Sequence, residues 1–518
     1  MQLSPLFCLG MILGTFSAGL ARGKDNATPY EMQEFERLGV VKAWEKYKNR
    51  LSWGKGQCLA ILDDGCDLNV PEWKVELPWG KKVLATYNSI DQNEDPSPVP
   101  PGYHGTTVGY PSSLNYEGKQ GVAFNDQVAQ VRAVTVVHLR KDEAQTMARA
   151  LEWVLENREK YGITAVNLSP LDNQEHTTSE ATAIDEPLKR LREAGVWVSA
   201  PCGNNGHVKG ISWPASAEYC FAIGASNPAT GLPHLDRFSN TDILSPATAT
   251  SSSNAAMAGC AMVLREAIEK SGYAWQKEGK TLPDAMMAIF QKTGAEVKDP
   301  ETGLAFHEAN LLHALDYVYS GGKLPVAPKG DSKAPRRTFS GKDVFESSEW
   351  TPVDYGIRKS PEFAQLEGEH LVIRTEAPEE NSGYFLQIPD VPPDATIEIV
   401  VKLDLRSGIH RVGFVLPSGE EYLINLYATG EIAAYAKEDY DVVKSPQPIV
   451  EARFLLDRAD RPRMQVFVNG GIDPVLSFEP RPALPGSQAP GLTIGETAGE
   501  YLGECLWESV EIAIAPPP

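Results

Sequence analysis

The stretch CLAILDDGCD, residues 58–67, joins five apolar residues to two carboxylates and a glycine. A short apolar run that ends in a turn signal is typical of a strand buried on both faces. Similar runs recur through the first part of the chain and alternate with segments of helical periodicity: KVLATY (82–87), VRAVTVV (131–137), ITAVNL (163–168), VWVSA (196–200) and CFAIGA (220–225). This alternation predicts an α/β fold, with a parallel sheet covered by helices on both faces.

Two helices can be placed between these strands. In the first, five apolar residues share one helical face: Met147, Ala150, Leu151, Val154 and Leu155. The second is DEPLKRLREAG, residues 185–195, and Gly195 suits the left-handed conformation that ends many helices.

The pattern changes after residue 320. Residues 321–345 are rich in Pro, Gly and Lys and have no apolar periodicity, which predicts a linker between the α/β domain (28–320) and a second domain (346–518). In the second domain, alternating strands and turn residues predict an all-β jelly-roll sandwich. Its runs from 454 to 470 and from 491 to 514 resemble laminin-G/concanavalin-A-like modules, which implies a glycan or a surface ligand as its partner.

The amino terminus predicts export. Residues 6–20 are mostly apolar but too short to span a bilayer, and small residues precede Arg22, so we expect a signal peptide over 1–21. No later stretch predicts a transmembrane anchor. The mature protein is therefore expected to be secreted or periplasmic.

Charge and cysteine content indicate which partners, disulfides and metal sites to expect. The formal net charge is −21, which excludes a nucleic-acid backbone as the expected partner because that partner needs a basic face. Six cysteines remain after residue 21, and several of them lie in apolar strand or helix settings, so we expect buried thiols. No cysteine or histidine spacing suggests zinc.

Four segments of the first domain carry side chains that can do chemistry. Asp63 ends the apolar strand of the opening stretch, His104 enters a Gly-Thr turn in YHGTTVG, and Asn204 lies in the turn of VSAPCGNNG. Ser253 precedes NAAMAGCAMVL, a helix with almost no polar face, which must be buried and would place the serine at a helix amino terminus. Each segment alone has an ordinary structural explanation, but together they follow the order Asp, His, Asn, Ser.

The order Asp, His, Ser is that of the subtilisins, and the chain resembles subtilisin-like serine peptidases over roughly residues 35–320. Further similar segments include GVAFNDQVAQVRAV, WPAS, CFAIGAS and RFSN. The resemblance implies that His104 is the general base, that Asp63 orients it, and that Ser253 attacks a peptide carbonyl. It also implies that Asn204 and the Ser253 backbone N–H stabilise the oxyanion.

Two further residues are predicted to bind substrate by the same resemblance. Ser169, in NLSP, is expected on an edge strand that pairs with the substrate backbone, and Gly203 is also expected to bind substrate. The expected partner is thus a protein or peptide substrate.

Two alanines, Ala255 and Ala256, set the register in which the nucleophile is predicted. The family pattern Gly-Thr-Ser-x-Ala-(Ala/Ser)-Pro, placed on residues 251–257, puts Ser253 at the serine and makes Ser251 and Ser252 its Gly and Thr. Met257 then replaces the proline. None of these departures deletes a catalytic atom, so we expect an active peptidase.

Alternatives stay open at this stage. An inactive subtilisin-like domain could serve as a glycan- or protein-binding module, and a Ser-His-Asp site alone does not separate peptide from ester hydrolysis. No cofactor can be assigned from the residues, although calcium is implied by the family resemblance. Only some dozen residues separate Ala21 from the catalytic domain, so either the domain folds without a folded inhibitory propeptide or its activity is restrained differently.

Overall fold

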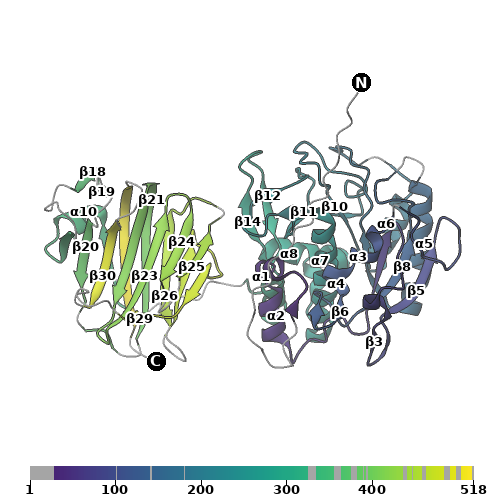
Figure 1. Cartoon of the computed structure of the whole chain (residues 1–518), viewed down its shortest axis with the longest axis horizontal. Helices are drawn as coiled ribbons and strands as arrows, with labels where there is room; N and C mark the ends of the chain where they lie inside the picture. The colour runs from purple at the N-terminus through teal and green to yellow at the C-terminus, as the bar shows by residue number, and fades with distance from the viewer. Residues whose placement is uncertain are drawn as a thin grey trace, which may run out of the picture.

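The computed structural model contains an α/β domain followed by an all-β domain (Figure 1). The predicted signal peptide lies outside the described residues. The structure describes residues 28–515 except 101, 140–142, 180, 325–333, 355–362, 375–381, 389, 393–394, 436–439, 446, 458–462, 483–489 and 497–502.

A ten-stranded sheet, counted over the described residues, organises the first domain. Eight neighbouring strands run parallel to one another, in the spatial order β5 (Val83–Asn88), β8 (Gln127–Arg132), β2 (Cys58–Asp63), β9 (Ile163–Leu168), β10 (Trp197–Pro201), β11 (Phe221–Ser226), β13 (Ile243–Pro246) and β15 (Ala305–Glu308). Two antiparallel strands, β14 (Ala295–Lys298) and β12 (Pro233–His234), pair with β15 and β11. The carboxyl ends of the parallel strands therefore meet at one edge, where active sites form in such sheets.

The predicted strands are found, with one shift. The strand expected over 131–137 instead spans Gln127–Arg132. Its first half was missed because Gln127 and Gln130 are polar and yet buried in the sheet, so hydropathy did not reveal the strand.

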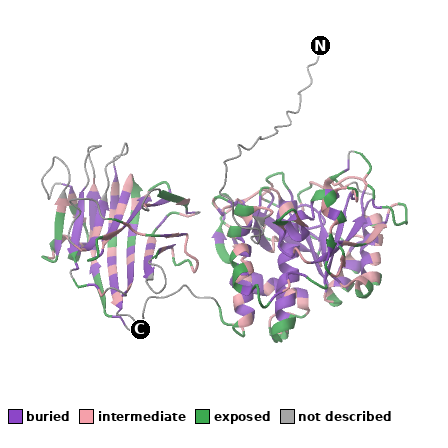
Figure 2. Ribbon diagram, turned by 60° about the horizontal axis from the view of Figure 1, so that its bottom comes forward, coloured by how far each residue is buried: buried purple, intermediate pink, exposed green. Residues whose placement is uncertain are grey.

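Helices cover both faces of this sheet. Strand β2 shows the division: Leu59 and Ile61 face one apolar core, whereas Cys58, Ala60 and Leu62 face the other. The predicted helices α5 (Ala144–Tyr161) and α6 (Asp185–Glu193) cover the second core, and all five predicted apolar residues of α5 are buried. The first core is covered by α1 (Met32–Arg37), α2 (Val40–Tyr47), α7 (Thr250–Ser271), α8 (Leu282–Thr293) and α9 (Leu311–Tyr319). Figure 2 shows the buried strands between outer helices that expose one side.

Helix α7 is the predicted buried helix, and it starts earlier than the sequence suggested. Its first residue is Thr250, so Ser253 lies a full turn inside it. Small residues allow close packing: a Cβ added at Gly259 would lie 2.9 Å from Val122 Cβ and 3.1 Å from Ser112 Cα. The neighbour at that point is the short helix α4 (Tyr110–Ser113), which follows α3 (His104–Thr107). Helix α7 therefore runs directly beside the chain segment that follows His104.

The second domain is a sandwich of two antiparallel sheets, as predicted. One contains β16 (Arg336–Ser340), β18 (Ala364–Glu367), β19 (His370–Arg374), β21 (Thr396–Ser407), β26 (Glu451–Asp457), β27 (Arg463–Val468), β28 (Leu476–Phe478) and β31 (Glu504–Ala515). The other contains β17 (Trp350–Asp354), β20 (Ser382–Gln387), β22 (Ile409–Val415), β23 (Glu420–Tyr427), β24 (Glu431–Tyr435), β25 (Tyr440–Lys444), β29 (Arg481–Pro482) and β30 (Gly491–Glu496). Apolar side chains from both sheets form one core between them.

The predicted linker over 321–345 is too long. Strand β16 pairs with β31, and helix α10 (Gly341–Glu346) follows it with a capping box in which Ser340 and Asp343 bond reciprocally. These residues therefore belong to the sandwich. Composition predicted a linker here. Arg336 and Arg337 nevertheless lie in a strand, since their backbone pairs with β31, and composition does not reveal such pairing.

Among the described residues, a carboxylate of the second domain contacts the first domain. Asp473, in the loop between β27 and β28, lies 2.9 Å from His313 Nε2 and accepts a 3.4 Å hydrogen bond from Asn310 Nδ2, the residue that caps α9. An acidic group at a helix amino terminus is favourably placed with respect to the helix dipole.

The six cysteines of the described residues are free and buried, as predicted: Cys58, Cys66, Cys202, Cys220, Cys260 and Cys505.

Candidate active site

The predicted acid and base lie together at the carboxyl edge of the sheet. Asp63 ends β2, and both of its carboxylate oxygens lie within hydrogen-bond distance of His104 Nδ1, at 3.0 and 2.9 Å. The Asp63 side chain is 1% exposed, whereas the His104 side chain is 29% exposed. A buried carboxylate that receives the Nδ1–H leaves Nε2, on the open side of the ring, as the basic nitrogen.

A second carboxylate, which the sequence did not single out for a role, holds the histidine backbone. Asp64 accepts hydrogen bonds from the backbone N–H groups of Gly105 at 2.9 Å and Tyr103 at 3.2 Å, with a longer contact to the N–H of His104 at 3.4 Å. Gly105 lets α3 approach β2, since a Cβ there would lie 2.7 Å from Asp63 Cβ and 2.4 Å from the Gly65 carbonyl oxygen. The motif DDG and the glycine after His104 thus together bring the Asp63 carboxylate and the His104 imidazole into contact.

The surroundings raise the pKa of His104 above its ordinary value of 6.5. Burial of the imidazole acts in the opposite direction and lowers the pKa, but the charge and hydrogen bond of Asp63, with the charge of Asp64, outweigh it. Burial and the neighbouring Asp63 charge also raise the pKa of Asp64.

Asn204 is fixed by the first residue of α7. Its Oδ1 accepts hydrogen bonds from the backbone N–H and from the hydroxyl of Thr250, both at 2.9 Å. Thr250 Oγ1 in turn accepts from the Gly203 N–H at 3.2 Å. Because Oδ1 faces Thr250, the amide Nδ2 points away from Thr250. Asn204 itself is exposed, so Nδ2 can donate a hydrogen bond to an external group.

Gly203 has a different role from the predicted substrate contact. Its N–H bonds to Thr250 and its carbonyl accepts from the Asp236 N–H, so its backbone is bonded within the domain. Its φ is +121°, and a Cβ would lie 2.1 Å from Asp236 Oδ2. The glycine is therefore needed to shape the turn that presents Asn204.

Ser253 does not occupy the position that the sequence predicted for it. Its side chain is fully buried, and its hydroxyl donates to the carbonyl oxygens of Gly224 at 2.9 Å and Ser245 at 2.6 Å. These carbonyls belong to β11 and β13. Strand β11 is three strand spacings, about 14 Å, from the strand that carries Asp63.

The backbone of Ser253 also excludes the predicted oxyanion role. Its N–H donates to the Ala249 carbonyl inside the helix, at 3.1 Å. Only the first turn of a helix has N–H groups without an intrahelical acceptor. The assignment of Ser253 as nucleophile and oxyanion donor is therefore wrong for this structure.

The start of α7 carries a different serine, Ser251, and the contacts of Asn254 show where this end of the helix lies. Asn254 Nδ2 donates to Asn167 Oδ1 on β9 at 2.7 Å and to the Ser199 carbonyl on β10 at 3.1 Å. Strand β9 lies between β2, which carries Asp63, and β10, which precedes Asn204, so the amino-terminal part of α7 lies over the sheet between these two residues. Ser251 precedes Asn254 by three residues and shares its helix face, one turn closer to the amino terminus.

The predicted substrate contact at Ser169 is also corrected. Strand β9 is a central strand and not an edge, and the Ser169 side chain is fully buried and bonded to Asn167. Beyond it, the Leu171 N–H donates to the Val137 carbonyl at 3.0 Å, and its carbonyl accepts from the Leu139 N–H at 2.9 Å. The Leu171 backbone is therefore already paired within the chain.

Over the described ranges, no group of three or more His, Cys, Asp or Glu side chains is arranged to hold a metal ion. Calcium also takes backbone carbonyl oxygens, so the calcium expectation stays a prediction. No helix in the part of the chain that the structure describes is both long and apolar enough to cross a membrane.

An Asp–His pair beside a helix amino terminus and a fixed side-chain amide is the arrangement that serine hydrolases use. Residues 54–287 match the model of the Subtilase family. The resemblance drawn from the sequence motifs is thereby confirmed.

Several curated proteins are similar to parts of the chain. A subtilisin-like protease of Coccidioides posadasii is 27% identical over 190 residues, and the match covers 36% of this chain and 45% of that protein. The minor extracellular protease Epr of Bacillus subtilis is 25% identical and covers 41% of this chain and 29% of its own. The thermophilic serine proteinase of Bacillus sp. strain AK1 is 25% identical, and the match covers 53% of this chain and 64% of that protein. The chain thus spans less than two thirds of each of these relatives.

Among solved structures, a cold adapted subtilisin-like serine proteinase aligns with 50% of this chain and 90% of its own, at 17% identity and a TM-score of 0.38.

Proposed function

We propose that the chain is a secreted serine endopeptidase with the triad Asp63, His104 and Ser251. The observation that supports this proposal is that Asn254, three residues after Ser251 in α7, bonds to Asn167 on β9, the strand between those that lead to Asp63 and Asn204. Ser251 also keeps the Thr-Ser pair of the family pattern, as Thr250-Ser251, which Ser253 does not. Export is supported by the apolar stretch before Arg22 and by the extracellular relative.

Each residue then has a chemical task. His104 Nε2 takes the proton from Ser251 Oγ as that oxygen attacks the peptide carbonyl, while Asp63 holds Nδ1–H and stabilises the imidazolium. The amide of Asn204 and the backbone N–H of Ser251, at the second position of α7, donate to the oxyanion. His104 next protonates the leaving amine, and water hydrolyses the acyl-enzyme.

The proposal is tested by phosphonylation and by peptide cleavage. The chain without residues 1–21 is incubated with a fluorophosphonate probe and, separately, with a library of fluorogenic peptides. Labelling together with peptide cleavage is expected. Labelling with ester but not peptide turnover would point to the esterase alternative, and a folded protein that is neither labelled nor active would leave the binding-module alternative.

Asn204→Ala is expected to lower kcat by about 10²–10³-fold, because one oxyanion donor is lost. KM should change little, since the donor acts on charge that develops only in the transition state. Steady-state kinetics on a cleaved peptide gives both constants. A large rise in KM with an unchanged kcat would show that Asn204 binds substrate in its ground state.

The pH dependence of kcat/KM should follow His104. The base must be neutral to accept a proton, and its pKa is raised, so activity should fall on the acid side at a higher pH than for an ordinary imidazole. Asp64→Asn removes one of the negative charges that raise this pKa, and the acid limb should move to lower pH. An acid limb that shifts upward or does not move in this variant would contradict the electrostatic role of Asp64.

A further inference from the structure

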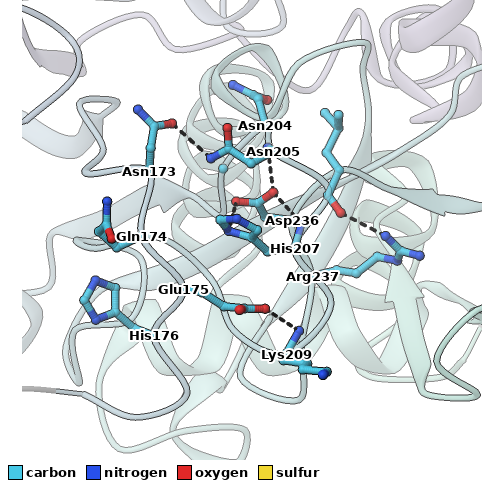
Figure 3. A network of polar contacts seen from close by, with 12 residues as sticks. Asn173, Gln174, Glu175, His176, Asn204, Asn205, His207, Lys209, Asp236 and Arg237 are labelled. Atoms are coloured by element: carbon cyan, nitrogen blue, oxygen red, sulfur yellow. Dashed lines mark hydrogen bonds and ion pairs between the residues drawn. The ribbon is translucent and has the colours of Figure 1, made fainter.

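The turn that carries Asn204 rests on a buried carboxylate from a distant segment. Asp236, which follows β12, is fully buried. Its Oδ1 accepts hydrogen bonds from the backbone N–H groups of Asn205 at 2.7 Å and His207 at 2.9 Å. Figure 3 shows the Asp236 carboxylate enclosed by this turn, with dashed lines to it.

The backbone of the same segment completes the attachment. The Asp236 N–H donates to the Gly203 carbonyl at 3.2 Å, and the Arg237 N–H donates to the His207 carbonyl at 2.9 Å. Asp236 therefore bonds to the residue before Asn204 and to the residue after it. Thr250 holds the Asn204 side chain from a third direction.

The second carboxylate oxygen of Asp236 indicates that this residue does more than stabilise the fold. Asp236 Oδ2 lies 3.4 Å from His207 Nδ1, but it has no hydrogen bond within the described residues. Ser212 Oγ, whose oxygen would lie 2.7 Å from a Cβ at Gly203, is likewise buried without a hydrogen bond there. Burying a carboxylate that is only half satisfied is unfavourable, and such groups are concentrated at functional sites.

We propose that Asp236 is a positioning residue for the oxyanion amide of Asn204, an inference that rests on the proposed function. The carboxylate fixes the backbone on both sides of Asn204, so the amide is held in place before substrate arrives. Such preorganisation matters because an oxyanion donor must lie within about 2.7–3.1 Å of the developing charge. Loss of this support should therefore lower kcat while KM changes little.

Three variants and one control test the role. Asp236→Ala should lower kcat about 10- to 100-fold, less than the about 10²–10³-fold expected for loss of the donor itself. Asp236→Asn keeps an oxygen that can accept both N–H groups, so it should recover most of kcat. The double variant Asn204→Ala with Asp236→Ala should be no slower than Asn204→Ala alone, because Asp236 acts through that amide.

Asp242→Ala is the matched control. Asp242 also accepts a backbone N–H, from Ala222 at 2.7 Å, and burial raises its pKa to about 6, but it bonds to β11 and not to the turn of Asn204. This variant should lose stability with little change in kcat. Equal falls in kcat for Asp242→Ala and Asp236→Ala, or additive losses in the double variant, would overturn the proposal.

Hydrogen exchange gives a second readout that needs no turnover. The amides of Asn205 and His207 should lose protection in Asp236→Ala and keep it in Asp242→Ala. Unchanged protection in Asp236→Ala would overturn the proposal even in an active enzyme. A wild-type protein that keeps this protection but is neither labelled nor active would instead remove the proposed function, and the catalytic role of Asp236 with it.

Discussion

Ser251→Ala is expected to abolish labelling by a fluorophosphonate and to lower kcat by on the order of 10⁶-fold, as loss of a nucleophile does in a triad. Ser253→Ala is expected to keep both labelling and turnover. The reason is geometric: the Ser253 hydroxyl donates to Gly224 and Ser245, on the far side of β10 from His104. Gel fluorescence after labelling, with kinetics on a peptide, separates the two serines.

Ser253→Ala should still have an effect, on stability. The one hydroxyl proton of Ser253 is shared between two buried carbonyl oxygens, and losing this donor costs about 1 kcal/mol. Ser252→Ala serves as a further control, since Ser252 is half-buried between the two residues. If Ser253→Ala were folded and unlabelled while Ser251→Ala was labelled normally, the structural assignment would be wrong.

Asp63→Asn is expected to lower kcat by about 10⁴-fold with little change in KM. An asparagine amide can donate to Nδ1, which favours the tautomer that carries its proton on Nε2 and so removes the base. Both Asp63 oxygens now face that nitrogen, so no other acceptor takes over.

The comparison with Asp64→Asn makes this prediction specific. Both aspartates are buried and adjacent, but Asp64 bonds backbone N–H groups and not the imidazole. Asp64→Asn should therefore retain most of the activity near its optimum and alter mainly the pH profile. A larger fall in kcat in Asp64→Asn than in Asp63→Asn would contradict the assignment of Asp63 as the carboxylate that orients His104.

Most of the α/β architecture could be predicted because its strands are buried on both faces and appear as apolar runs. Strand β9 begins and ends where the sequence predicted, and the burial of α5 follows its helical period. The predicted boundaries of strand β8 were too far along the chain, because hydropathy does not reveal that Gln127 and Gln130 are buried. The Asp63–His104 pair could be predicted because LAILDDGCD and YHGTTVG, taken together with the later motifs, resemble those of subtilisin-like peptidases.

The nucleophile could not be placed reliably by its local pattern. Alanines such as Ala255 and Ala256 are frequent in any buried helix, so they are weak markers of register. Two other residues are stronger: Thr250, which holds Asn204, and Gly259, where a side chain would collide with Val122 and Ser112. Their roles depend on contacts with distant segments, which the sequence alone does not show.

The same limit applies to Asp236. It lies about thirty residues from the turn that it holds, and only the folded chain brings its carboxylate to Asn205 and His207. The motif RFSN, residues 237–240, directly follows Asp236, yet nothing in that motif indicates which carboxylate supports Asn204. The predicted glycan or surface ligand of the sandwich stays a prediction.

The most direct test of the central claim is to locate the phosphonyl adduct. Wild-type protein is labelled with the fluorophosphonate, digested, and sequenced by tandem mass spectrometry across residues 249–259. The account predicts an adduct on Ser251 Oγ. An adduct on Ser253, or no adduct on any of the three serines of a folded protein, would contradict it.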